Sequence, residues 1–106
     1  MNDVQVSVET EGDRVCLSIS GDVDLSNAAA VETQLTTAIP NWASAVELDL
    51  REVTYLDSAG LQVVFALTVK LRRLQIDLRI VAPEDSPARH AIEMAGMASI
   101  AHIASA

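Results

Sequence analysis

The residues with the clearest chemical potential are one serine and three aspartates. Ser58 directly follows Asp57, while Asp22 and Asp24 lie earlier in the chain where a loop is expected. With His90 and an acid, Ser58 could in principle form a hydrolytic triad. However, the segment around it lacks the glycine two positions before the serine that a nucleophile elbow uses. We therefore do not expect Ser58 to be a catalytic nucleophile.

Other catalytic chemistry has little support in the sequence. A receiver-type phosphoacceptor could use Asp49 or a loop aspartate, but such a domain needs a lysine on a late strand. The only lysine, Lys70, falls within an expected helix. A metal site would need His90, His102 and a carboxylate to converge from separate elements. No cofactor-binding glycine motif is present, so we expect no catalysis, no metal and no cofactor.

Two interpretations of Ser58 remain open. It lies where the N-cap of a helix is expected, and its hydroxyl could simply accept a hydrogen bond from a backbone N–H of the first turn. Alternatively, Ser58 could carry a phosphoryl group, which the N–H groups and positive dipole end of the helix would accommodate. The added charge would lie beside Asp57 and within reach of Asp22 or Asp24.

The composition limits the classes of partner that this protein is expected to bind. The 106 residues carry a net charge of −8, with 15 acidic and 7 basic side chains and a single cysteine, Cys16. Nucleic acids and anionic membranes bind dense Lys/Arg clusters, so neither is an expected partner. One cysteine excludes an intramolecular disulfide. The N-terminus lacks the pattern of a signal peptide and no stretch is apolar enough to span a bilayer. We expect a single cytoplasmic domain over residues 1–106.

Alternating apolar and polar residues predict strands. Four runs show the alternation, and they cover residues 4–8, 15–19, 46–50 and 76–80. The turn at residues 11–13 joins the first two runs into a hairpin. The tail, residues 97–106, could form a short edge strand or a fraying end.

Helical spacing fills the intervals between the runs. The first helix is expected to start after Ser26 as N-cap and to end at Pro40. The second begins near Ser58 and has a core stripe of Leu61, Val64, Leu67, Leu71 and Leu74. The third opens with Ser86 as cap before a proline and stops near Gly96.

The predicted fold is an α/β domain with the order β-β-α-β-α-β-α, with or without a final strand. An antiparallel hairpin followed by parallel crossovers gives a mixed sheet of four to five strands. Since every strand alternates, the helices should cover mainly one face of the sheet. A sheet buried on both faces would show continuous apolar strands.

Four pieces of the chain, in order, resemble the sulfate-transporter and anti-sigma-factor-antagonist (STAS) domains, specifically the stand-alone bacterial anti-sigma-factor antagonists. They are residues 21–24 (GDVD) with Ala28 soon after, 48–50 (LDL) with Val53, 57–61 (DSAGL) and 93–97 (EMAGM). The resemblance extends over roughly residues 4–103, and the DSAGL piece is its most specific part. One departure is the turn at residues 74–77, which lacks the glycines often found there in the family.

The resemblance implies roles for individual residues. Ser58 matches the serine that an anti-sigma factor with serine-kinase activity phosphorylates, and Asp57 matches the acid beside it. Gly60 matches a glycine that keeps the helix start accessible, and Asp24 an acid of the kinase-facing surface. Ala59 stands where a second serine is common. The resemblance also implies that a serine phosphatase restores the serine, and that the protein binds no cofactor or small-molecule substrate.

Helical geometry suggests a further contact. Phe65 and Val69 point away from the core stripe of the second helix, near Gln62, Arg72 and Arg73. These apolar side chains either anchor a partner or are covered by another helix. The expected partner-binding set is Asp22, Asp24, Asp57, Ser58, Ala59, Gly60 and Phe65.

The favoured function is a phosphorylation-switched module for partner switching in bacterial transcription regulation. It would bind an anti-sigma kinase when Ser58 is unmodified and release it when Ser58 is phosphorylated. The alternative is a constitutive subunit of the same fold, in a lipid-transport ATP-binding-cassette complex or a stress-signalling scaffold. That subunit would depend on contacts such as Phe65 and not on the charge at Ser58.

Overall fold

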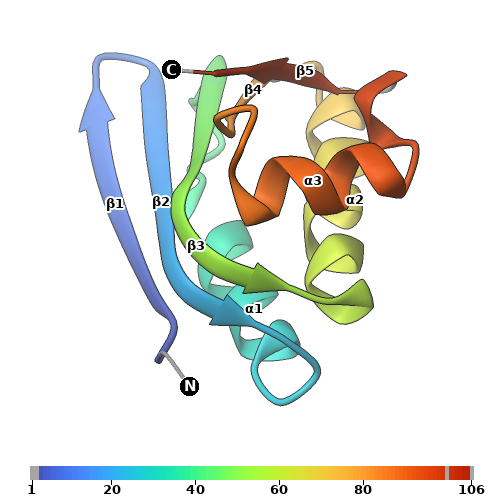
Figure 1. Cartoon of the computed structure of the whole chain (residues 1–106). Coiled ribbons are helices and arrows are strands. Elements are labelled where there is room, and N and C mark those ends of the chain that lie inside the picture. Colours follow the sequence, from blue (N-terminus) through green and yellow to red (C-terminus); the bar gives the residue numbers. More distant parts are fainter. Residues whose placement is uncertain (1–2, 100, 106) are drawn as a thin grey trace.

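The computed structural model describes residues 3–99 and 101–105, and the order of its elements agrees with the prediction (Figure 1). The elements are β1 (Gln5–Glu11), β2 (Arg14–Val23), α1 (Ala28–Ala38), β3 (Ala45–Leu56), α2 (Ser58–Arg73), β4 (Asp77–Val81), α3 (Pro87–Met94), a 3-10 turn (Met97–Ser99) and β5 (His102–Ala104). Part of the tail is therefore a strand, as one of the two alternatives proposed.

The five strands form one mixed sheet in the order β1-β2-β3-β4-β5. β1 is antiparallel to β2, and each later strand is parallel to the one before it. Because the order never reverses and parallel crossovers are right-handed, successive crossover helices fall on the same face. In Figure 1 the ends of β2 and β3 lie together at the bottom of the molecule, beside the start of α2 and the loop before α1.

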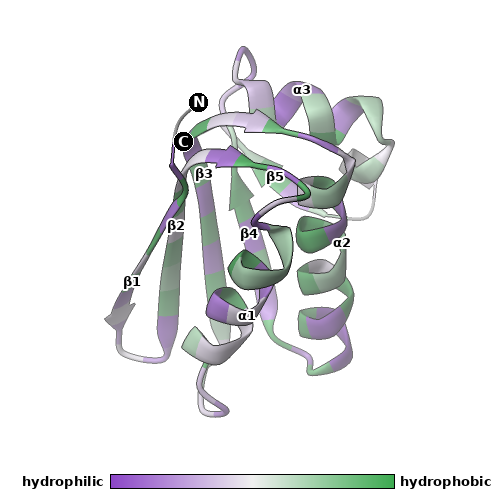
Figure 2. Ribbon diagram, turned by 90° about the horizontal axis from the view of Figure 1, so that it is seen from below, coloured by the Kyte–Doolittle hydropathy of each residue, from purple (hydrophilic) through white to green (hydrophobic). Residues whose placement is uncertain are grey.

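The alternation of the strands separates a core face from an open face. Val46, Leu48 and Leu50 of β3 are buried, whereas Glu47 and Asp49 between them are half-buried. The resulting bands of hydrophobic and hydrophilic residues are visible along β2 and β3 in Figure 2. Helices supply the other half of the core through Val31, Leu35, Val64, Leu67, Leu71, Ala88 and Ile92.

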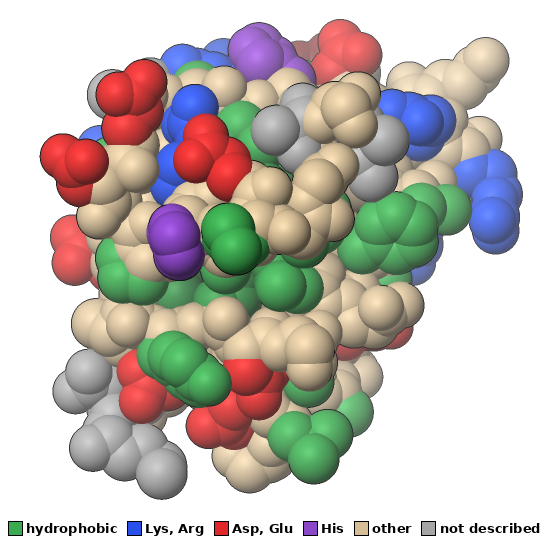
Figure 3. All heavy atoms as spheres, turned by 45° about the vertical axis from the view of Figure 1, so that its right-hand side comes forward, with side chains coloured by type: hydrophobic (Ala, Val, Ile, Leu, Met, Phe, Trp, Pro, Cys, Tyr) green, Lys and Arg blue, Asp and Glu red, His purple; other side chains and the backbone are tan. Residues whose placement is uncertain are grey.

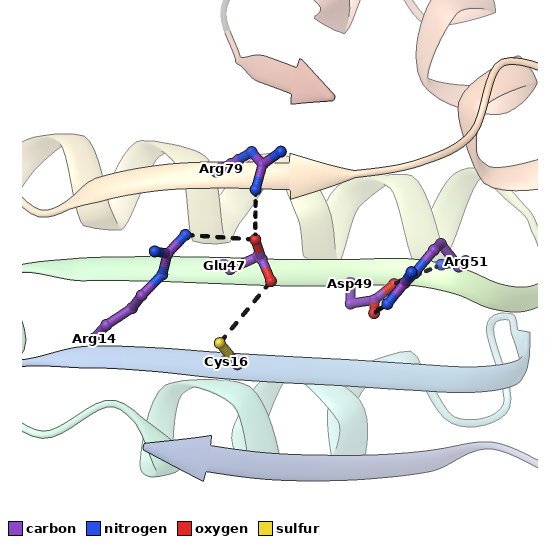
Figure 4. Close-up of polar contacts among 6 residues, drawn as sticks. All are labelled: Arg14, Cys16, Glu47, Asp49, Arg51 and Arg79. Atoms are coloured by element: carbon purple, nitrogen blue, oxygen red, sulfur yellow. Dashed lines mark hydrogen bonds and ion pairs between the residues drawn. The ribbon is translucent and has the colours of Figure 1, made fainter. Parts of the chain in front are cut away.

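The open face of the sheet compensates its own charges (Figure 4). Glu47 accepts a hydrogen bond from Arg79 at 2.8 Å and pairs with Arg14 at 3.5 Å. The Cys16 thiol contacts the other Glu47 oxygen at 3.9 Å. Burial and the Glu47 charge raise the pKa of Cys16, so the thiol stays protonated at neutral pH and is a weak nucleophile.

β3 is longer than the sequence predicted. The alternation indicated a strand over residues 46–50, but β3 has 12 residues. Its pairing with β2 shifts register between Ser18 and Ser20 and again between Gly21 and Asp22. Each extra residue breaks the two-residue period, so the continuation looked like a connection. A consequence is that Asp22, expected in a loop, lies within β2 opposite Tyr55.

The start of α1 also differs from the prediction. Asn27, not Ser26, is the N-cap of α1. The Ser26 hydroxyl instead donates to Asp24 Oδ1 at 2.5 Å. Asn27 points back toward β2, where its Oδ1 accepts from the Asp24 N–H at 3.0 Å and its Nδ2 donates to the Asp22 carbonyl at 2.8 Å. The loop thus uses its polar side chains to hold itself together.

The core stripe of α2 is correct for Val64, Leu67 and Leu71, which are buried. Leu61 is only half-buried, and Leu74 is 55% exposed because α2 ends at Arg73 and Leu74 is its C-cap. The other buried α2 residues are Gly60, Val63 and Thr68.

The third helix follows its sequence signals. Ser86 is the N-cap of α3, with its hydroxyl oxygen accepting from the Arg89 N–H at 3.2 Å and Pro87 opening the first turn. α3 ends at Met94, and Gly96 then takes a left-handed φ of 74°. Local sequence is sufficient here because both ends of the helix are fixed by neighbouring residues.

Candidate functional site

Asp57, and not Ser58, caps α2. Its Oδ1 accepts a hydrogen bond from the Gly60 N–H at 3.0 Å, and Ser58 is the first residue of the helix. The expectation of a capping serine was wrong because the acid one position earlier adopts the extended backbone that an N-cap needs. Ser58 is exposed. Within residues 3–99 and 101–105 its hydroxyl makes no hydrogen bond, so it faces solvent.

Gly60 is required by close packing. A Cβ at this position would lie 2.6 Å from Leu56 Cδ1 and 2.8 Å from the Val23 carbonyl oxygen. Real side chains do not approach so closely. Glycine therefore allows the first turn of α2 to pack directly against the ends of β2 and β3, which places Ser58 at their rim.

The Asp57 carboxylate also joins two segments distant in sequence. While Oδ1 caps α2, Oδ2 accepts from the Leu25 N–H at 3.2 Å. The Asp57 N–H in turn donates to the Val23 carbonyl at 3.2 Å. Through these contacts the β2–α1 loop lies against the start of α2, as the sequence analysis expected of the Asp22–Asp24 segment and Ser58.

The acids of the predicted site lie at this same end of the molecule. Asp22 accepts from the Thr54 hydroxyl at 2.6 Å, and Asp24 accepts from the Ser26 N–H at 3.0 Å. On the face drawn in Figure 3, acidic and hydrophobic side chains lie together at the lower end, where no basic side chain is drawn; other acidic side chains lie at the upper left, and basic ones lie mainly at the upper right. The end that carries Ser58 is therefore acidic with apolar patches.

The end of the molecule that carries Ser58 also has exposed hydrophobic side chains. Leu25 is 83% exposed and Tyr55 is 53% exposed; neither was selected from the sequence. A large apolar residue inside the polar loop of residues 24–27 was the available signal for Leu25. The sequence left open whether Phe65 is exposed or covered by another helix; it is 40% exposed. It lies two turns after Ser58, about 10 Å along the axis of α2. Ala59 is half-buried and packs against the core.

The residues considered for other chemistry lie on separate elements: Asp49 in β3, His90 in α3 and His102 in β5. In the described part of the chain, no group of three or more metal-ligating side chains gathers. Ser58 opens α2 and His90 lies in α3, and no hydrogen bond joins their side chains among the described residues. Asp49 lies inside β3, where Arg51 holds its carboxylate at 2.7 Å, and this hydrogen bond lowers the pKa of Asp49. No helix among the described residues is long and apolar enough to cross a membrane.

The mixed sheet, with its strands in sequence order, and the crossover helices define a small α/β domain. Comparison with known families shows to which family of such domains the chain belongs. The model of the STAS domain matches residues 5–106. The chain therefore belongs to the STAS domain family, as the sequence motifs indicated.

Curated relatives carry related names. The candidate anti-sigma factor antagonist BtrV of Bordetella bronchiseptica is 31% identical over 86 residues, which cover 81% of this chain and 73% of BtrV. The anti-sigma-F factor antagonist RsfB of Mycobacterium tuberculosis is 30% identical over 94 residues, covering 89% of this chain and 75% of RsfB.

Solved structures share the fold. An anti-sigma factor antagonist from Mycobacterium paratuberculosis superposes with a TM-score of 0.82 at 23% identity, covering 98% of this chain and 87% of that one. The antagonist SpoIIAA in its unphosphorylated form covers 96% of this chain and 89% of its own, with a TM-score of 0.72 at 16% identity. Its phosphorylated form, from Bacillus, gives 0.67 at 17%, with coverage of 95% and 92%.

Proposed function

We propose that this protein is an anti-sigma factor antagonist: a regulatory, protein-binding module switched by phosphorylation of Ser58. In this proposal it binds an anti-sigma factor with serine-kinase activity through the end of the molecule formed by the β2–α1 loop and the start of α2. The predicted contacts are Asp22, Asp24, Asp57, Ser58, Ala59, Gly60 and Phe65. The names of the curated relatives support this class of function.

The observation that carries the proposal is the state of the Ser58 hydroxyl. Asp57 caps α2, so Ser58 is exposed at the rim without a structural duty. A hydroxyl of this kind can be modified without removing a hydrogen bond that the fold needs. The amides of the first helical turn would then meet the phosphate at the positive end of the helix dipole.

The transfer itself uses chemistry supplied by the partner. The Ser58 Oγ would bond to the γ-phosphorus of ATP held by the kinase, while the bond from that phosphorus to the bridging oxygen of ADP breaks. The hydroxyl proton would pass to a base of the kinase, and ADP would leave. A serine phosphatase would reverse the modification by hydrolysis, with water replacing the serine oxygen and inorganic phosphate released.

Phosphorylation would oppose binding by charge and by shape. A phosphoserine carries about −1.5 to −2 charges at neutral pH and would enter an interface complementary to a hydroxyl. The Asp57 carboxylate lies beside it. Burying such a charge without a partner group is costly, so the modified protein should dissociate.

The test compares Ser58→Ala and Ser58→Asp with wild type for binding to the cognate anti-sigma kinase, measured by titration calorimetry. We expect Ser58→Ala to bind like wild type and to accept no phosphate by mass spectrometry. We expect Ser58→Asp to lose at least tenfold in affinity, as for charge placed in a buried contact. Ser7→Asp is the matched control, because Ser7 is an exposed serine on β1.

The alternative of a constitutive structural subunit gives the opposite result. If Ser58→Asp bound its partner as tightly as wild type, while Phe65→Ala did not, the switch would be rejected in favour of a permanent complex. Phe65 is exposed on α2 and its loss should not disturb the core.

A further inference from the structure

The most exposed large hydrophobic side chain at the Ser58 end belongs to a residue outside the predicted site. Leu25 is 83% exposed and lies in the β2–α1 loop. A single exposed leucine is common on protein surfaces, but exposed apolar side chains that are rimmed by polar groups mark interaction sites, and Tyr55 at the same end is also exposed. The acids Asp22, Asp24 and Asp57 surround this stretch of the chain, so a complementary partner would offer an apolar pocket with a basic rim.

The loop that carries Leu25 is held by its own hydrogen bonds. The Asp24 carboxylate accepts from the Ser26 N–H at 3.0 Å and from the Ser26 hydroxyl. The Asn27 amide binds the backbone of Asp24 and of Asp22. These contacts fix the ends of the loop but leave the Leu25 N–H to a residue outside it.

That outside residue is Asp57. Its Oδ2 accepts from the Leu25 N–H at 3.2 Å, and the same carboxylate caps α2 through Oδ1 and the Gly60 N–H. One carboxylate therefore fixes both the helix that begins with Ser58 and the loop that presents Leu25. Any force that turns the Asp57 side chain alters both contacts.

A phosphate on Ser58 would exert such a force. Its oxygens would compete with Asp57 for the amides of the first helical turn, which attract anions strongly. The two groups are adjacent in sequence and carry like charges, so each disfavours the other at that position. The contact between Asp57 and Leu25 is the one that can break without unwinding α2.

We propose that Asp57 is a positioning residue that couples the modification state of Ser58 to the Leu25 loop, and that Leu25 is the apolar anchor for the partner. Phosphorylation then withdraws the Asp57 carboxylate and frees the loop, so that Leu25 is no longer presented in one orientation. This inference rests on the proposed function, because it explains how the same site is regulated.

The coupling can be tested in the isolated protein. We would measure the order parameter of the Leu25 N–H by nitrogen-15 relaxation in wild type and in protein with phosphoserine at position 58. We expect the wild-type value to approach that of rigid backbone, about 0.85, and the phosphorylated value to fall below about 0.6. An unchanged Leu25 order parameter after phosphorylation would overturn the coupling.

Asp57→Asn isolates the contact chemically. Asparagine caps helices about as well as aspartate, but its amide places an NH2 donor where one of the two carboxylate oxygens lies, so either Gly60 or Leu25 loses its acceptor. We expect α2 to remain intact by amide chemical shifts while the Leu25 loop loosens. Asp49→Asn, which removes a carboxylate of the open face bound to Arg51, is the control and should leave Leu25 rigid. Asp57→Asn with an equally rigid Leu25 would contradict the proposal.

Binding to the anti-sigma kinase tests the anchor. We expect Leu25→Ala to lose at least tenfold in affinity, in the range of interface anchors. Leu74→Ala is the matched control, since Leu74 is an exposed leucine at the other end of α2. Equal affinities for the two variants would reject Leu25 as an anchor.

These measurements separate the two proposals. If Ser58→Asp weakens partner binding while Leu25 keeps its order in the phosphorylated protein, the switch stands and the coupling through Asp57 is wrong. If phosphorylation mobilises Leu25 but Ser58→Asp binds the partner like wild type, the coupling stands and the proposed switch is wrong.

Discussion

The residues at the start of α2 have different structural roles, although in the sequence they form one short motif. Asp57 caps the helix and binds the loop, while Ser58 presents its hydroxyl to solvent. Gly60 lets both lie against the strand ends, because its missing side chain leaves room for Leu56 and the Val23 carbonyl. The motif works because each position has a different physical requirement.

Gly60→Ala should therefore be destabilising although alanine is the better helix former. The new Cβ would overlap Leu56 Cδ1 and the Val23 carbonyl oxygen. Only the leucine side chain can move, so we expect a loss of about 1–3 kcal/mol in the free energy of unfolding. Urea denaturation measures it. Gln62→Ala, at an exposed position of the same helix, is the control; equal stability of both variants would show that α2 shifts freely.

At the scale of elements, the end of α2 is closed by a Schellman motif without its usual glycine. The Ile76 N–H donates to the Leu71 carbonyl at 2.8 Å and the Gln75 N–H to the Arg72 carbonyl at 3.1 Å. Gln75 takes a positive φ of 59° to form these bonds. The last turn of α2 also carries three basic side chains, Lys70, Arg72 and Arg73. Their positive charges interact favourably with the negative end of the helix dipole. The chain therefore forms the same turn without a glycine, and Gln75 takes the positive φ in its place.

Replacing Gln75 by glycine should stabilise the protein. Glycine adopts positive φ without the steric cost that a Cβ brings, although it also gains freedom in the unfolded chain. We expect a net gain of about 0.5–1 kcal/mol, seen as a higher Tm by calorimetry. Gln75→Val should have the opposite effect, because a β-branched side chain is poorly suited to this backbone. A lower Tm for Gln75→Gly would mean that the glutamine side chain makes a contribution of its own.

At the scale of the whole molecule, the excess of negative charge affects stability. The net charge is −8, on a body that measures 35 × 27 × 22 Å. At 0.01 M ionic strength the screening length is about 30 Å, so nearly all of the charges act on one another. Near 0.15 M it is about 8 Å, and only neighbouring charges interact. The folded state is therefore under more self-repulsion at low salt.

Thermal stability should rise with salt at pH 7. We expect the Tm to increase by a few degrees between 0.01 M and 0.15 M KCl, because screening relieves the excess of negative charge. Calorimetry at constant buffer measures it. Glu32→Gln, which removes an exposed acid on α1, should raise the Tm more at the lower salt concentration. A Tm that falls with salt would show that ion pairs such as Arg79–Glu47 outweigh the repulsion.

Patterns confined to neighbouring residues could be predicted from the sequence. The alternation in residues 46–50 identified the start of β3, and Ser86 before Pro87 identified the start of α3. The DSAGL motif identified the STAS family. The first two depend on periodicity or capping within a few residues, and the third depends on the resemblance of a short motif to a known family.

Other features depended on the tertiary structure. The extension of β3 to Leu56 depends on its pairing with β2 through two register shifts, and Leu74 is exposed because α2 ends one residue before it. The link from Asp57 to Leu25 requires the β2–α1 loop to lie against the helix. The sequence alone determined which residues could act at this end of the molecule. Only the packing of segments 32 residues apart decided which role each of these residues has. Hydrogen bonds between distant segments produce no periodic pattern in a sequence, so they could not be predicted from it.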